Sequence, residues 1–171
     1  MRRIITVTVL NQSGVLNRVT GLMMKRQFNI ESMTVGHTEQ PTISKMTFVV
    51  HVEDAQKLEQ LLKQLQKQID VLKVQDLTDQ VLVERELALI KVQASATKRL
   101  ELATLIEPFR AQIIDAGKQV VTYQLTGRPD KIDAFVELVR PYGIKELTRT
   151  GVTAFTREHQ KVQTPIKLLT Y

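Results

Sequence analysis

The stretch NQSGVLNRVTGLMMKRQFNIESM, residues 11–33, places a short polar loop directly before an amphipathic segment. Apolar residues then recur at the spacing of a helix with one buried face, at Val15, Leu16, Val19, Leu22 and Met23. The alternating, β-branched segment 4–10 before the loop predicts a strand, and segment 30–37 after the helix alternates again. The stretch therefore joins two strands through a helix.

The rest of the first half completes a β-α-β-β-α-β order. Residues 43–52 alternate as a third strand, and residues 71–77 predict a fourth. Between them, a leucine stripe over residues 58–65 predicts a second helix, which Asp54 can cap.

The same order recurs in the second half. The pattern predicts strands at 87–92, 113–114, 120–125 and 144–155, and helices at 100–109 and 130–142, with Pro108 stopping or bending the first of these helices. We therefore predict an α+β fold with two ferredoxin-like βαββαβ domains in tandem. The expected division is a first domain at 1–78, a polar linker at 79–86, a second domain at 87–157, and a tail at 158–171 that frays.

The third strand carries apolar residues on both faces. Met46, Phe48 and Val50 lie on one face, and Val49 lies on the other. If helices cover only one face, Val49 has no partner within the chain. Because symmetric pairing of two chains would cover the other face or an edge, we predict a homodimer held by residues 1–77.

Composition excludes several classes of protein. No apolar run exceeds four residues, whereas a membrane span needs about 20. The N-terminal residues alternate as a strand instead of forming a signal-peptide core, so we expect a cytoplasmic protein without membrane contact. The absence of cysteine excludes disulfides, thiolate metal sites and thiol nucleophiles. The net charge of +6 comes from scattered residues, which indicates solvated faces rather than a polybasic tract.

No catalytic motif is present. The patterns GxSxG, GxGxxG, the Walker loop and HExxH are all absent. His37 and Glu39 could share a strand face, but zinc sites normally have three or four ligands. We therefore expect no catalytic residue and no metal site in this chain.

Ferredoxin-like domains also occur among RNA-binding proteins, which stack bases on aromatic residues of the sheet. The corresponding strand here, residues 45–50, has Phe48 as its single aromatic residue and no glycine. We therefore expect no nucleic-acid partner. RNA binding, if present, would give an affinity that falls steeply with salt.

The loop at residues 11–14 has two interpretations. In the structural one, Ser13 or Asn11 caps the helix and Gly14 eases the turn. In the functional one, free N–H groups of the first helical turn bind an anion, and Gly14 lets a ligand carboxylate approach the backbone. Asn11 offers both a donor and an acceptor, which suits an amino acid.

The first half resembles an ACT domain, an amino-acid-sensing module, because Asn-x-x-Gly-Val-Leu follows the first strand. The wider family often has Asp where Asn11 stands. More specifically, the chain over about residues 1–157 resembles the small regulatory subunit of acetolactate synthase, also called acetohydroxyacid synthase. The matching features are Arg18, residues 28–32 (FNIES), Thr34, and the strings at 83–87, 109–115, 131–135 and 149–152.

The resemblance implies a regulatory subunit with no active site of its own. Such a subunit binds the large catalytic subunit, a transferase that holds thiamine diphosphate, magnesium and FAD. It activates that subunit and confers feedback inhibition by valine or another branched-chain amino acid. The alternative is an ACT-type sensor that regulates a different biosynthetic enzyme.

The resemblance also implies an effector site between two paired ACT domains. The loop after the first strand comes from one protomer, and the start of the second strand comes from the other. The implied valine-binding residues are Asn11, Gly14, Val15, Leu16, Asn29, Ile30 and Val35, with Ile30 or Val35 as the apolar wall.

Overall fold

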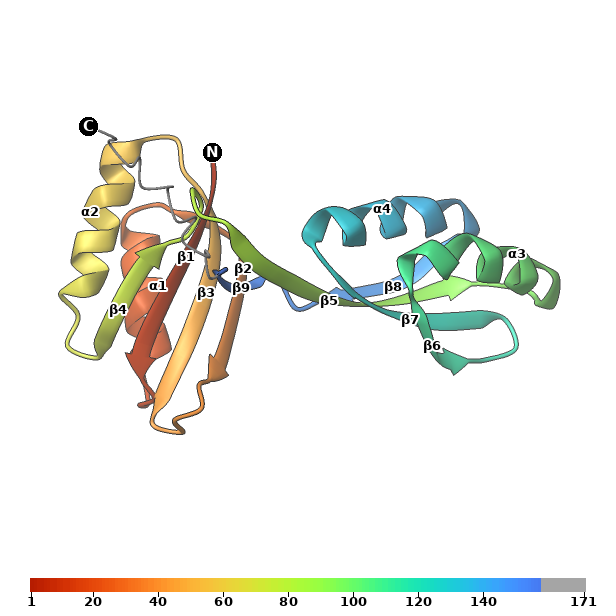
Figure 1. Cartoon of the computed structure of the whole chain (residues 1–171), viewed down its shortest axis with the longest axis horizontal. Helices are drawn as coiled ribbons and strands as arrows, with labels where there is room; N and C mark the ends of the chain where they lie inside the picture. Colours follow the sequence, from red (N-terminus) through yellow and green to blue (C-terminus); the bar gives the residue numbers. More distant parts are fainter. Residues whose placement is uncertain (158–171) are drawn as a thin grey trace, which may run out of the picture.

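The computed structural model describes residues 1–157, so the predicted tail lies outside the described residues. Two sheet-and-helix units lie at opposite ends of an elongated molecule and are joined by the long strand β5 (Leu82–Gln93) (Figure 1). Within residues 1–157, no helix is long and apolar enough to cross a membrane.

The first domain has the predicted β-α-β-β-α-β order. Its elements are β1 (Arg2–Leu10), α1 (Val15–Lys25), β2 (Asn29–His37), β3 (Ile43–His51), α2 (Ala55–Gln66) and β4 (Val71–Asp76). The antiparallel sheet has the order β2-β3-β1-β4, which leaves β2 at an edge. The apolar stripes of α1 and α2 pack on one face of this sheet around Phe48, which is fully buried.

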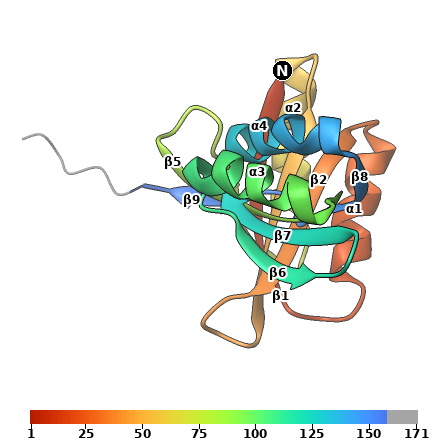
Figure 2. The same ribbon diagram turned by 90° about the vertical axis from the view of Figure 1, so that its right-hand side faces the viewer.

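The second domain repeats this arrangement. After β5 come α3 (Ala96–Ile106), β6 (Gln112–Ala116), β7 (Val120–Gly127), α4 (Pro129–Val139), β8 (Ile144–Arg149) and β9 (Thr153–Thr156). Helices α3 and α4 lie side by side over the sheet β6-β7-β5-β8 (Figure 2). Helix α3 begins before the predicted residue 100 and ends at Ile106, not at residue 109. Pro108 lies in the short 3-10 helix Glu107–Phe109 that follows, as expected for a proline that stops a helix. A second such helix, Arg140–Tyr142, follows α4. These elements confirm an α+β fold with two βαββαβ domains.

The connection between the domains differs from the predicted polar linker. Strand β5 begins at Leu82, not at residue 87, and its first residues pair with β9 from Leu82 opposite Thr156 to Arg85 opposite Thr153. The predicted last strand is also divided, because Gly151 adopts a left-handed φ of 81° between β8 and β9. A two-stranded ribbon therefore connects the domains.

This ribbon covers the face of the first sheet that the helices leave open. Val49 is fully buried in a second apolar cluster together with Ile4, Leu77, Val152 and Ala154. The expectation that Val49 lacks a partner within the chain was therefore wrong, because β9 returns from the second domain to pack on it. Val49 therefore gives no support to the predicted homodimer. The remaining support is the edge of the first sheet at β2.

Shortening Val49 tests this cover. We expect Val49→Ala to lower the free energy of unfolding by about 2 kcal/mol. The substitution leaves a cavity between the first sheet and the ribbon, and these packed layers cannot collapse freely to fill it. Urea unfolding followed by circular dichroism measures the change. Val81→Ala, at a side chain that is 48% exposed, is the matched control and should cost about 0.5 kcal/mol or less. Equal losses in the two variants would contradict this packing.

Candidate functional site

The loop between β1 and α1 is held by backbone contacts at both ends. The Leu10 N–H donates to the Asp70 carbonyl at 2.8 Å, and the Asn11 N–H donates to the Thr42 carbonyl at 2.7 Å. Gly14 is the N-cap residue of α1 with a φ of 82°, and no side chain makes a capping hydrogen bond there. Gly14 therefore serves the turn as both interpretations allow, but neither Ser13 nor Asn11 caps the helix, in contrast to the structural interpretation.

The first turn of α1 consequently keeps open donors. The Val15 N–H donates to the Gln12 carbonyl at 3.3 Å, and the Arg18 N–H donates to the Gly14 carbonyl at 3.0 Å. Within residues 1–157, the N–H groups of Leu16 and Asn17 have no acceptor. Two donors and the positive end of the helix dipole thus remain available to an anion.

Arg18 places a cationic guanidinium beside this turn, and its charge is partly balanced by Asp70. Its guanidinium donates to the carboxylate of Asp70, a side chain that is only 8% exposed. A Cβ placed on Gly14 would stand 3.3 Å from the other terminal nitrogen, Nη1 of Arg18. Sequence reasoning did not assign Arg18 to the site, although its position one helical turn after Gly14 was a usable signal.

Asn11 and His37 connect this loop to the end of β2. The Asn11 amide nitrogen donates to the Pro41 carbonyl at 3.2 Å and lies 3.4 Å from Nδ1 of His37. His37 therefore contacts Asn11. Among the described residues, no group of three His, Asp or Glu side chains gathers as a metal site would require.

The apolar candidates separate into surface and core. Leu16 and Val35 are 40% and 46% exposed, so both side chains can contact a ligand or a partner. Val15 is 2% exposed and belongs to the core under α1, so only its backbone is near the site.

Within one chain, Asn29 and Ile30 lie far from the loop that contains Gly14. Asn29 pairs with His51, whereas His37, at the other end of β2, pairs with Ser44. At about 3.4 Å per residue, the two ends of this nine-residue strand are about 27 Å apart. One chain therefore carries the loop half of the site at one end of β2 and the strand half at the other.

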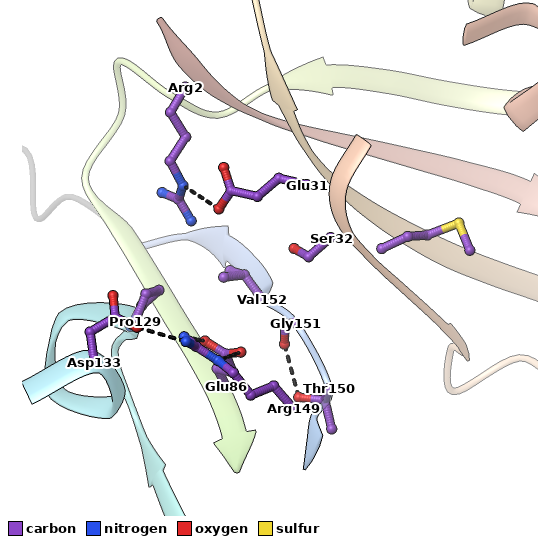
Figure 3. Close-up of a pocket in the computed structure, with 11 residues that line it drawn as sticks. Arg2, Glu31, Ser32, Glu86, Pro129, Asp133, Arg149, Thr150, Gly151 and Val152 are labelled. Atoms are coloured by element: carbon purple, nitrogen blue, oxygen red, sulfur yellow. Dashed lines mark hydrogen bonds and ion pairs between the residues drawn. The ribbon is translucent and has the colours of Figure 1, made fainter. Parts of the chain in front are cut away.

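A separate polar cluster lies where the domains meet. Arg149 donates to both oxygens of Glu86, at 2.7 and 2.8 Å, and to Asp133 at 2.6 Å (Figure 3). These bonds, chiefly those to Glu86, raise the pKa of Arg149 above its ordinary value. The Glu86 side chain is 4% exposed. The cluster borders an interdomain cavity of about 630 Å³, but its charges are committed to one another, so its role is structural.

The strand considered for stacking bases does not present its aromatic residue at the surface. Phe48, the aromatic residue considered for that role, is fully buried under the helices of the first domain. It is therefore a core residue and cannot contact a nucleic acid.

Comparison with known proteins matches both domains to a single family. Residues 5–73 match a model described as the AHAS small subunit-like ACT domain, and residues 85–158 match one described as the small subunit of acetolactate synthase. The first domain is therefore an ACT domain.

Whole-chain similarity agrees with this assignment. The acetolactate synthase small subunit of Bacillus subtilis (strain 168) is 58% identical over 161 residues, which cover 94% of each chain. A probable acetolactate synthase small subunit of Archaeoglobus fulgidus is 48% identical, covering 94% of this chain and 100% of that one. The crystal structure of the acetolactate synthase small subunit from Thermotoga maritima superposes with a TM-score of 0.84 at 35% identity, covering 93% of this chain and 99% of that chain. The chain belongs to the acetolactate synthase small-subunit family.

Proposed function

We propose that this chain is the cytoplasmic regulatory subunit of an acetolactate synthase. It activates the catalytic large subunit and confers feedback inhibition by valine in branched-chain amino acid biosynthesis. The observation that carries the proposal is the turn at Gly14, where open backbone donors and the Arg18 guanidinium lie together. In this proposal, thiamine diphosphate, magnesium and FAD belong to the large subunit.

The chemistry of valine fits this turn. Its carboxylate would accept from the Leu16 and Asn17 N–H groups and face the Arg18 charge. The Asn11 side-chain oxygen would accept from the ammonium group, and the exposed Val35 side chain would form an apolar wall. Since one methylene is worth about 0.8 kcal/mol, discrimination among branched-chain amino acids would be modest.

The missing half of the site would come from a second copy. Strand β2 is an edge strand, and an edge of this kind tends to be paired. Antiparallel pairing of two β2 strands about a two-fold axis would place Asn29 and Ile30 of one chain near His37 and the loop of the other. We therefore propose a homodimer through the ACT domains, with the effector at its interface.

A charge at the centre of β2 tests this dimer. Met33 is the middle residue of the strand, so two-fold pairing would bring both copies close together. Met33→Asp would then oppose two carboxylates about 6 Å apart, which costs about 1–3 kcal/mol and raises the dimer Kd by about 5- to 150-fold. Sedimentation velocity across micromolar concentrations measures this.

Met24→Asp is the control for the added charge, because Met24 is 73% exposed on α1. It should leave the dimer Kd unchanged. A wild-type chain that sediments only as a monomer would contradict the proposed dimer.

The direct test of the function is reconstitution with the catalytic large subunit. Adding this chain should raise the rate of acetolactate formation, and valine should then inhibit that increased rate. Absence of both effects, together with retrieval of a different enzyme in a pull-down, would favour an ACT-type sensor of another pathway.

A further inference from the structure

The turn from β8 to β9 lies directly against β2, the strand that carries three of the effector-site candidates. The Thr34 hydroxyl donates to the Val152 carbonyl at 3.0 Å. A Cβ placed on Gly151 would stand 2.8 Å from the Ser32 Cβ and 3.1 Å from its Oγ, so these two segments approach too closely for a side chain at Gly151. Figure 3 shows Gly151 and Val152 facing Ser32 across the domain junction.

This turn is anchored on both sides. Before it, Arg149 is held by Glu86 and Asp133 in the second domain. Within it, Thr150 exchanges backbone and side-chain hydrogen bonds with Leu87 of β5, at 3.0 and 3.1 Å. After it, Val152 is buried in the cluster beneath the first sheet. Because the turn is fixed at both ends, a movement of β2 at this contact would displace the turn and the residues that hold it.

The contact also lies between the two effector-binding parts of β2. Ser32 and Thr34 face the ribbon, Ile30 precedes them, and Val35 follows them. A paired strand transmits displacement along its length, since its backbone hydrogen bonds hold successive residues in register.

We propose that residues 150–152, here named the coupling turn, transmit the state of the effector site on β2 to the second domain. This inference rests on the proposed function, because it requires an effector at the ACT interface. Occupancy of the site shifts β2, and the coupling turn passes that shift through Arg149 and β5 to the second domain. Ser32, Thr34 and Gly151 are positioning residues in this device and contact no effector.

Gly151→Ala is the primary variant. It adds a methyl group at the Ser32 contact and also strains a φ of 81°. Gly143→Ala is its matched control. Gly143 has a φ of 94° in the same domain, but its added Cβ would meet only the Gln93 side chain, at 3.7 Å or more. The pair separates loss of the contact from backbone strain.

Two further variants isolate the contact. Thr34→Val removes the hydrogen bond to Val152 while keeping the side-chain volume and the backbone. Ser32→Gly combined with Gly151→Ala removes the atoms that the new methyl group meets, so it should restore coupling if the clash is the cause. Thr34→Val also provides the test if Gly151→Ala does not fold.

The measurements are valine binding by calorimetry and valine inhibition of the reconstituted holoenzyme. We expect Gly151→Ala and Thr34→Val to bind valine within about twofold of wild type, while inhibition at saturating valine falls about threefold or more. Gly143→Ala and the Ser32→Gly/Gly151→Ala double variant should be inhibited like wild type.

Two results would overturn the inference alone. One is full inhibition in both Gly151→Ala and Thr34→Val. The other is a loss of inhibition that only follows a loss of valine binding. A wild-type chain that binds no valine would instead refute the proposed function, and the coupling role with it.

Discussion

Gly14→Asp is expected to abolish feedback inhibition while the catalytic subunit remains activated. The new carboxylate would lie where the carboxylate of valine binds in the proposed site, and two like charges about 4 Å apart repel by about 4 kcal/mol at an effective dielectric of 20. That repulsion weakens binding about a thousandfold. Arg18 does not cancel this loss of affinity, because its charge lies beside the turn in both the wild type and the Gly14→Asp variant.

Gly14→Asn is the matched control for this variant. The left-handed φ of 82° strains most side chains, but Asn and Asp tolerate it similarly and have nearly the same volume. The two variants therefore differ mainly in charge. Calorimetric titration of valine should give a much weaker Kd for Gly14→Asp than for Gly14→Asn. Equal affinities in the two proteins would refute an effector site at this turn.

Arg149→Met is expected to lower the free energy of unfolding by about 3–5 kcal/mol. The substitution leaves Glu86, whose side chain is 4% exposed, as a buried carboxylate without its partner. Chemical unfolding followed by circular dichroism measures the loss. The Glu86→Met/Arg149→Met double variant should recover most of it, because a hydrophobic pair replaces the ion pair.

The open face of the same sheet provides the control. Lys91 and Glu146 form an ion pair at 2.7 Å between β5 and β8, but their side chains are 38% and 65% exposed. Glu146→Gln should therefore change the free energy of unfolding far less than Arg149→Met does. If it costs as much as Arg149→Met, burial does not determine the strength of these pairs.

Local patterns predicted the elements of each domain well, because helix and strand periodicities are properties of short segments. The same patterns missed the start of β5. Glu84, Arg85 and Glu86 are three consecutive charged residues, which read as a polar linker. Their strand conformation depends on pairing with β9, and no local signal in residues 82–86 indicates a partner near residue 155.

The candidate site was predicted in part for a similar reason. Gly14 was predicted as a turn residue because a glycine at a strand-to-helix turn has a definite conformational use, and its positive φ agrees with that use. Val15 was assigned to the site, yet the helical stripe places its side chain in the core. The spacing of Arg18 from Gly14 is visible in the sequence, but its ion pair with Asp70 is not, because Asp70 becomes its neighbour only after folding.

The position of β9 also determines the order in which the chain can mature on the ribosome. Synthesis proceeds from the N-terminus at about 5–20 residues per second, and domains usually fold as they emerge. Here Ile4, Val49 and Leu77 need Val152 and Ala154 as neighbours. The apolar residues on this face of the first sheet therefore stay exposed to solvent until the whole second domain has been translated. A chaperone that binds nascent apolar surface would meet this chain at that stage.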